Sequence, residues 1–145
     1  MGKKNNQYQR YLDGYAMINK LEMNLDAIAR EQAMSFGQYL ILKQIIEEHC
    51  DEPTLLADTF GVSRPAMSRK LNSLFGTGKV IKKRNQTDAD QRKVIIQATV
   101  AGQQALITLN AAYRQWLSTE LPDGEDYQQL FDQFIQQTKP LAVGH

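Results

Sequence analysis

Residues 54 to 102 read TLLADTFGVSRPAMSRKLNSLFGTGKVIKKRNQTDADQRKVIIQATVAG. The first part of this stretch predicts two short helices joined by a tight turn. Gly61 comes just after the apolar Phe60, at the position where helices commonly end in a left-handed residue. Ser63 can then cap the next helix through its hydroxyl. Pro65 suits the first turn of that helix, where a missing N–H costs little.

The second helix is expected to start near Arg64 and to have one apolar and one polar face. Met67, Leu71 and Leu74 recur at four- and three-residue spacing and predict a buried stripe, with Phe75 at its edge. The opposite face gathers side chain types that can bond base edges and phosphates, because arginine can bind guanine and asparagine can bind adenine in a bidentate way. This polar face comprises Arg64, Pro65, Ser68, Arg69 and Asn72. An ordinary solvated face would look the same, so this helix alone leaves both interpretations open.

A basic hairpin is expected after this helix. Val80–Arg84 alternates weakly and then turns basic, and residues 94–96 form a β-branched run, which predicts two strands. Residues 85–91 between them are too polar and too long for a two-residue turn, so the tip should project as a wing. Basic residues around the tip could follow a phosphate backbone and place an arginine in a minor groove. These residues are Lys79, Lys82, Lys83, Arg84, Arg92 and Lys93.

Charge is concentrated in the same part of the chain. The whole chain of 145 residues has a formal net charge of +1. Residues 53–99 carry nine Lys and Arg against three Asp and Glu, a net charge of +6, whereas residues 1–52 and 100–145 carry −2 and −3. A basic middle between acidic flanks indicates one localised polyanion-binding surface and disfavours a general basic tail.

These residues resemble the MarR family of bacterial transcriptional regulators. The resemblance rests on LADTFGVSRPAMSRKLNSLFGTGKVIKKR, a D-x-R at Asp90 and Arg92, and a T-x-x-G at Thr99 to Gly102, about a third of the chain. It departs from the family at Ala98, where leucine is usual. By this resemblance the helix after the turn enters the major groove, and Ser63 lies on it with Arg64, Pro65, Ser68 and Arg69. Arg92 would be the wing arginine, with Asp90 holding it or a neighbouring arginine in place.

The flanking segments predict long amphipathic helices. Apolar residues recur at helical spacing from Tyr8 to about Arg30, and again from Phe36 to about Glu48. Thr99 can cap a third helix that runs to Pro122, and a last helix is expected from about Asp123. In that last helix, Tyr127, Leu130, Phe131, Phe134 and Ile135 are predicted to face inward. The predicted fold class is therefore mainly α with a small β-hairpin wing, a winged helix-turn-helix.

The long terminal helices predict a homodimer. We interpret residues 1–145 as one protomer, with residues 33–99 as the winged-helix DNA-binding region and residues 1–32 and 100–145 as dimerisation helices. A small central domain could not cover all the apolar faces of the flanks, and symmetric dimers suit palindromic sites. A monomeric helical bundle is the alternative.

Other chemistries receive little support from the sequence. Cys50 is the single cysteine and lies in the run EEHCDE, whose negative field would raise its thiol pKa, which disfavours redox sensing. The same run lacks enough converging ligands for zinc, so no metal or cofactor is expected. No phosphate loop, paired catalytic carboxylates or Ser-His-Asp set is found, and an enzyme is not expected. With no signal peptide or long apolar span, we expect a cytoplasmic protein that does not insert into a membrane.

The sequence thus predicts a homodimeric regulator of transcription, most simply a repressor, that binds a near-palindromic site in double-stranded DNA. Its base- and backbone-contacting residues would be those of the polar face and wing, with Lys82, Lys83, Arg84 and Lys93 on the phosphates. The resemblance also implies control by a small aromatic or anionic effector in a cleft that Tyr11, Tyr15, Phe36, Tyr39, Tyr113 and Trp116 could line, although such aromatics more often pack in a core. A winged helix that binds protein and not DNA is the alternative.

Overall fold

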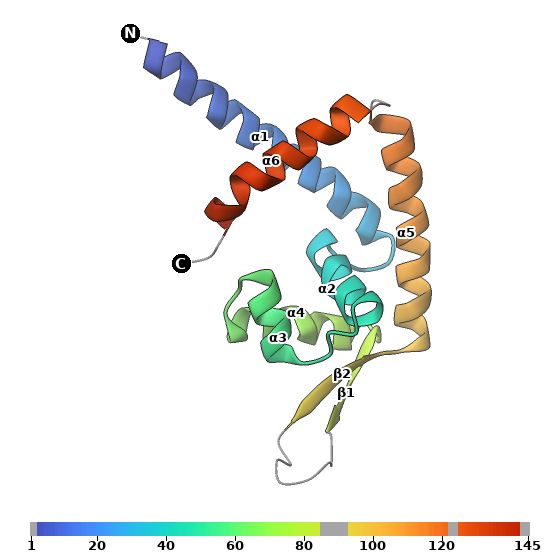
Figure 1. Cartoon of the computed structure of the whole chain (residues 1–145). Coiled ribbons are helices and arrows are strands. Elements are labelled where there is room, and N and C mark those ends of the chain that lie inside the picture. Colours follow the sequence, from blue (N-terminus) through green and yellow to red (C-terminus); the bar gives the residue numbers. More distant parts are fainter. Residues whose placement is uncertain (1–2, 85–92, 122–124, 143–145) are drawn as a thin grey trace.

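The computed structural model describes residues 3–84, 93–121 and 125–142. It confirms the predicted architecture of helices around a small antiparallel hairpin (Figure 1). The elements in order are α1 (Lys3–Arg30), α2 (Phe36–Glu47), α3 (Pro53–Phe60), α4 (Arg64–Gly76), β1 (Val80–Arg84), β2 (Val94–Ala98), α5 (Val100–Glu120) and α6 (Glu125–Ala142). The predicted bounds hold to within a few residues, except that α1 begins at Lys3, earlier than the predicted Tyr8.

The turn between α3 and α4 has the predicted chemistry. Gly61 ends α3 with φ 62° and ψ 32°, a left-handed conformation that costs glycine little. Ser63 caps α4, its hydroxyl oxygen accepting a bond of 3.2 Å from the N–H of Ala66, and Pro65 lies in the first turn. A Cβ added to Gly61 would meet nothing within 4 Å, so backbone conformation and not close helix packing requires glycine there.

The core lies in the winged-helix region. Met67, Leu71 and Leu74 of α4 are each almost fully buried, as predicted, and they belong to one cluster with Leu42 of α2 and Leu56 of α3. The same cluster extends to Leu106 and Leu109 of α5. Burying a leucine of this kind contributes about 1.5 to 3 kcal/mol, so the helices and hairpin are held as one packed unit.

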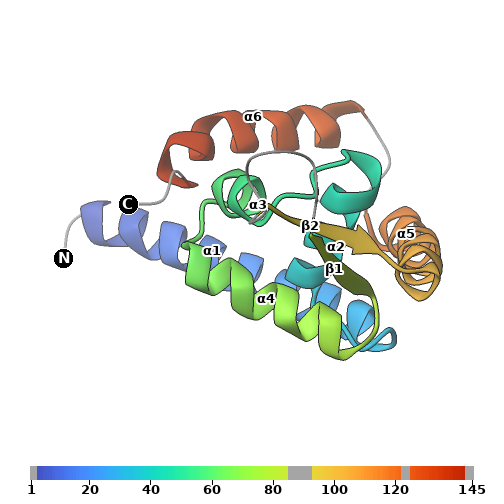
Figure 2. The same cartoon turned by 90° about the horizontal axis from the view of Figure 1, so that it is seen from below.

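Helix α6 and most of α1 lie outside this core, whereas Ala29 near the end of α1 belongs to it. In Figure 1, α1 and α6 cross in projection above the winged-helix region, but Figure 2 shows them at opposite sides of the molecule. The predicted apolar stripe of α1 is exposed from Tyr8 to Leu21. The prediction that the stripe of α6 faces inward is wrong for the single chain. Of that stripe, Leu130, Phe131, Phe134 and Ile135 are exposed, because no other described element covers them.

Within the described ranges, no helix combines the length and the apolar character needed to cross a membrane.

Candidate nucleic-acid interface

One face of α4 is free of protein contacts that would bury it. Pro65, Ser68, Arg69 and Asn72 are exposed on the side opposite the buried stripe, and Arg64 is exposed in the first turn. Ser63 is also exposed at the start of the helix, although its hydroxyl is used in the cap. Figure 2 shows α4 and the hairpin together on the face of the molecule turned toward the viewer. The six predicted residues of this helix are therefore all accessible to a ligand.

A shallow hollow connects this face to the hairpin. Its volume is about 260 Å³, and α3, α4, β1 and β2 all contribute to its walls. Arg64, Ser68 and Lys82 provide charged and hydroxyl groups, and Thr54 adds a second hydroxyl. Two cationic side chains and two hydroxyls fit a phosphate oxygen. The hollow therefore brings these polar side chains together on one surface, beside the apolar Pro53, Leu71 and Val94 that complete its lining.

The two central wing lysines lie on opposite faces of the hairpin. Lys82 pairs with Ile96 and Lys83 with Ile95 across the antiparallel ladder, and successive residues of a strand alternate in direction. Lys82 shares its face with the buried Ile96, and its ammonium lies 4.7 Å from the centre of the Phe75 ring at the end of α4. Lys82 is thus held beside α4 by a cation–π contact, whereas Lys83 points away from α4.

Strand β2 and the residue before it are tied to the segment before α3. The N–H of Ile96 donates to the carbonyl oxygen of Asp51 over 2.8 Å. The Lys93 ammonium lies 3.0 Å from a carboxylate oxygen of Glu52. Lys93 was predicted to contact phosphate. Its charge is partly balanced by the carboxylate of Glu52, the residue before α3. Arg84 is exposed at the end of β1. Asp90 and Arg92 lie outside the described residues.

The T-x-x-G at the start of α5 fixes that helix to the hairpin. Thr99 caps α5 as predicted, and its hydroxyl also donates to the carbonyl oxygens of Gly78 and Lys79, over 2.6 and 3.1 Å. Gly102 lies so close to the chain at Lys79 that an added Cβ would come within 2.1 Å of the Lys79 carbonyl oxygen. Only glycine can occupy this position without a shift of the backbone.

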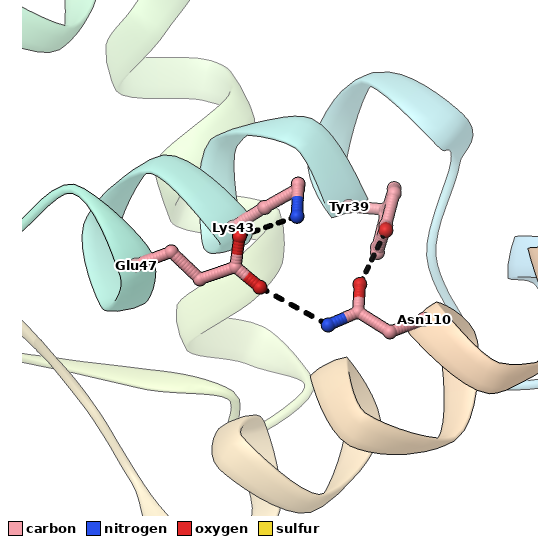
Figure 3. Close-up of polar contacts among 4 residues, drawn as sticks. All are labelled: Tyr39, Lys43, Glu47 and Asn110. Atoms are coloured by element: carbon pink, nitrogen blue, oxygen red, sulfur yellow. Dashed lines mark hydrogen bonds and ion pairs between the residues drawn. The ribbon is translucent and has the colours of Figure 1, made fainter.

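Farther along α5, a chain of polar contacts joins it to α2 (Figure 3). The Tyr39 hydroxyl donates to Oδ1 of Asn110 over 2.5 Å, and Nδ2 of Asn110 donates to Oε1 of Glu47 over 3.1 Å. Glu47 also forms an ion pair with Lys43, which is the main cause of its lowered pKa. Burial raises the pKa of Tyr39, so its hydroxyl keeps its proton and remains a donor.

The predicted aromatic cleft is largely a packed cluster. The rings of Phe36, Tyr39 and Tyr113 contact one another, with centroids 4.7 to 6.1 Å apart. Tyr39 and Tyr113 are buried, which confirms that they belong to the core, whereas Tyr11 and Tyr15 are exposed on α1. Trp116 of α5 is half-buried. The Tyr113 hydroxyl donates to the carbonyl oxygen of Leu25, and burial raises the pKa of Tyr113 to about 12.

Cys50 lies in a setting that disfavours a thiolate. Burial is the main cause of its raised pKa, and the neighbouring charges of Asp51 and Glu52 raise it further, although a bond with Thr59 lowers it. The sequence predicted the direction from the acidic neighbours alone and missed the larger effect of burial. Among the described residues, no three His, Cys, Asp or Glu side chains gather in a way that could hold a metal ion.

Sequence reasoning missed three participants of these surfaces. Thr54 is the first residue of the quoted stretch, and nothing in its local sequence indicates that it lines the hollow. Phe75 was assigned to the edge of the core, although it also supports Lys82. Asn110 could not be recognised from the sequence, because a single asparagine within a long helix forms no pattern.

This arrangement defines a winged helix-turn-helix protein: a short helix, a tight turn, an exposed polar helix and a hairpin packed beside it. Comparison with solved structures shows that, among winged helix-turn-helix proteins, the chain has the fold of the MarR transcription regulators. It resembles a mutant of MarR from E. coli complexed with operator DNA, with a TM-score of 0.78 and 19% identity over 95% of this chain and 99% of that one.

Two further structures have the same fold. A MarR family transcription regulator aligns with a TM-score of 0.79 and 15% identity, over 97% of this chain and 93% of that one. The organohalide-sensing regulator RdhR in its 2,4-dichlorophenol-bound form aligns with a TM-score of 0.72 and 15% identity, over 94% and 81%. No protein-family model and no curated protein matches the sequence.

Proposed function

We propose that this chain is a MarR-type transcription regulator that binds a specific site in double-stranded DNA. The observation that carries the proposal is the hollow that Arg64 and Ser68 of α4 line together with Lys82 of β1, in the part of the chain with a net charge of +6. The reading helix would enter a major groove, and the wing would follow the adjacent backbone. Arg69 and Asn72, exposed on the same helix, would add contacts to base edges.

We further propose that the chain acts as a homodimer on a near-palindromic operator. The exposed stripes of α1 and α6 support this, because each is a row of large apolar side chains without a cover in the single chain. Two copies that pair through these helices would present two reading helices about one DNA turn, or roughly 34 Å, apart.

Repression relieved by a small ligand is the proposed mode of action. A dimer bound to promoter DNA would block the access of polymerase without any additional protein. Binding of a small aromatic or anionic molecule near Phe36, Tyr39 and Tyr113 would displace α2 from α5 and so alter the spacing of the reading helices. The likeness to RdhR, solved with 2,4-dichlorophenol, supports an aromatic ligand. We propose a cytoplasmic location, where the DNA of such an operator lies.

Selection of duplex DNA by the purified chain tests the proposal. Fragments recovered from a random library should share a near-palindromic motif, and binding to that motif should weaken as salt rises, because phosphate contacts release counterions. A chain that binds no duplex even at low ionic strength would instead favour the alternative of a winged helix that binds protein. Enrichment without a shared motif would remove sequence specificity from the proposal.

A further inference from the structure

Besides the apolar packing of Leu106, Leu109 and Tyr113, backbone and polar contacts attach helix α5 to the winged-helix region at two separate places. The first is the contact between Gly102 and the backbone of Lys79, reinforced by the Thr99 hydroxyl. The second is the polar chain from Tyr39 through Asn110 to Glu47 (Figure 3). A helix fixed at one point can pivot about it, whereas a second fixed point sets its direction. The second attachment, together with the packing of Tyr113, therefore sets the direction of α5.

The first attachment has the properties of a pivot. Backbone meets backbone there without an intervening side chain, so sliding is restricted while small rotations remain possible. Asn110 lies eight residues farther along α5, or about 12 Å at about 1.5 Å per residue. Glu120 at the end of the helix lies about 27 Å from Gly102 on the same basis. A displacement of about 1 Å at Asn110 thus becomes about 2 Å at the end of α5.

The second attachment depends on the chemistry of a carboxamide. Asn110 accepts a bond from a hydroxyl with its oxygen and donates one to a carboxylate with its nitrogen. A carboxylate at this position could still accept from Tyr39 but would face Glu47 with like charge. A hydroxyl or an alkyl group could not make both contacts at this length. The side chain at position 110 is therefore matched to both partners on α2.

We propose that Asn110 is a positioning residue that sets the angle between α5 and the winged-helix region, and hence the separation of the two reading helices in the dimer. The inference rests on the proposed function for its consequence in DNA recognition. The apolar packing of Phe36, Tyr39 and Tyr113 holds α2 against α5 without Asn110, so a change at position 110 alters the angle and leaves the fold intact.

Replacement of Asn110 by aspartate tests the proposal. N110D should bind the selected operator about tenfold more weakly, which corresponds to the loss of one hydrogen bond and the gain of a repulsive pair. Its affinity for random DNA should be unchanged, and the operator spacing that it prefers should shift by a base pair. The double variant N110D/E47Q should restore binding, because a carboxamide at position 47 can donate to the new carboxylate at position 110 and accept from Lys43. Gln115→Glu, which adds the same charge at an exposed position of α5, is the matched control.

A distance measurement separates this inference from the proposed function. With Cys50 changed to serine and Lys83 to cysteine, a spin label on the outer face of each wing reports the separation of the two copies without DNA. N110D should shift or broaden that distance, and N110D/E47Q should restore it. An unchanged distance, or an operator affinity and spacing like those of the unaltered chain, would overturn the inference. If N110D shifts the distance although the chain binds no duplex DNA, the role of Asn110 in setting the angle of α5 stands and the DNA-binding function is rejected.

Discussion

A Cβ atom on Gly102 would lie 2.1 Å from the carbonyl oxygen of Lys79 and 3.0 Å from its carbonyl carbon. Both atoms belong to the backbone that leads into β1. Neither can therefore move aside as the end of a flexible side chain could. The start of α5 and the base of the hairpin therefore meet at a contact that no other residue type allows. This contact explains the final glycine of the T-x-x-G stretch in physical terms.

Replacing Gly102 with alanine should destabilise the fold by about 1 to 3 kcal/mol, since overpacking displaces the backbone. Gly76→Ala is the control, because a Cβ there meets nothing within 4 Å and its change should stay within about 0.5 kcal/mol. Unfolding in urea, monitored by circular dichroism, measures both. Equal stabilities of the two variants would contradict the close approach.

Arg69→Ala should weaken operator binding by about 1 to 3 kcal/mol if Arg69 reads a base. The loss on random DNA should be much smaller, because a base contact carries sequence information that a phosphate contact lacks. Lys70→Ala is the matched control, since the Lys70 ammonium lies about 4.0 Å from the Cβ position of Gly37 and thus toward α2. Gel-shift titrations on both DNAs give the comparison. Equal losses on operator and random DNA would remove Arg69 from the base contacts.

The two wing lysines should differ in their effect on salt dependence. Lys82 lies beside Arg64 and Ser68, so Lys82→Ala should reduce the slope of log affinity against log salt by about 1, the value for one phosphate contact. Lys83, on the opposite face, should change the slope little. Lys82→Arg keeps the charge over Phe75 and should bind almost normally. If Lys83→Ala had the larger effect, the outer face of the hairpin would be the one that meets DNA.

Phe131→Glu should dissociate the dimer, because it places a charge in the apolar stripe of α6. The side chain is 47% exposed in the single chain, and its burial by a partner would contribute about 1.5 to 3 kcal/mol. Gln133→Glu, an exposed polar position of the same helix, should leave the dimer intact. Sedimentation velocity over a range of concentrations measures both. A monomeric unaltered chain at all concentrations would show that the stripes do not pair with each other.

Alkaline titration should reveal Tyr113. Because its pKa is raised to about 12 from the ordinary value of 10.0, the folded state holds this proton more tightly than the unfolded state. The resulting stability is fully present below about pH 10 and is lost as pH rises toward 12. Ultraviolet absorbance of tyrosinate should show a late-titrating group that is absent from Tyr113→Phe. A variant with an unchanged late phase would assign that phase to another tyrosine, with Tyr39 the next candidate.

Much of the winged-helix region could be predicted because its determinants are local. The left-handed Gly61, the Ser63 cap and the stripe of Met67, Leu71 and Leu74 each depend on residues within a turn or two of the helix. The exposed polar face of α4 then follows from helical periodicity, because residues on the side of a helix opposite a buried stripe must face outward. The fold class and the residues of the reading helix were predicted from such patterns.

The remaining features depend on contacts between distant residues. The inward orientation predicted for α6 was wrong because periodicity finds an apolar face without finding what covers it. The hollow that joins Thr54 to Lys82 likewise forms only where α3 and the hairpin dock beside α4.

By itself, the sequence determined the helix-turn-helix, the strands of the hairpin, the Thr99 cap and the concentration of positive charge, since backbone conformation, capping and periodicity are properties of neighbouring residues. Only the tertiary structure decided that Lys82 and not Lys83 faces Phe75 of α4, that Gly102 touches Lys79, and that Asn110 joins α5 to α2. These depend on how the elements are docked in three dimensions, because strand register and helix contact bring together residues that no local pattern connects.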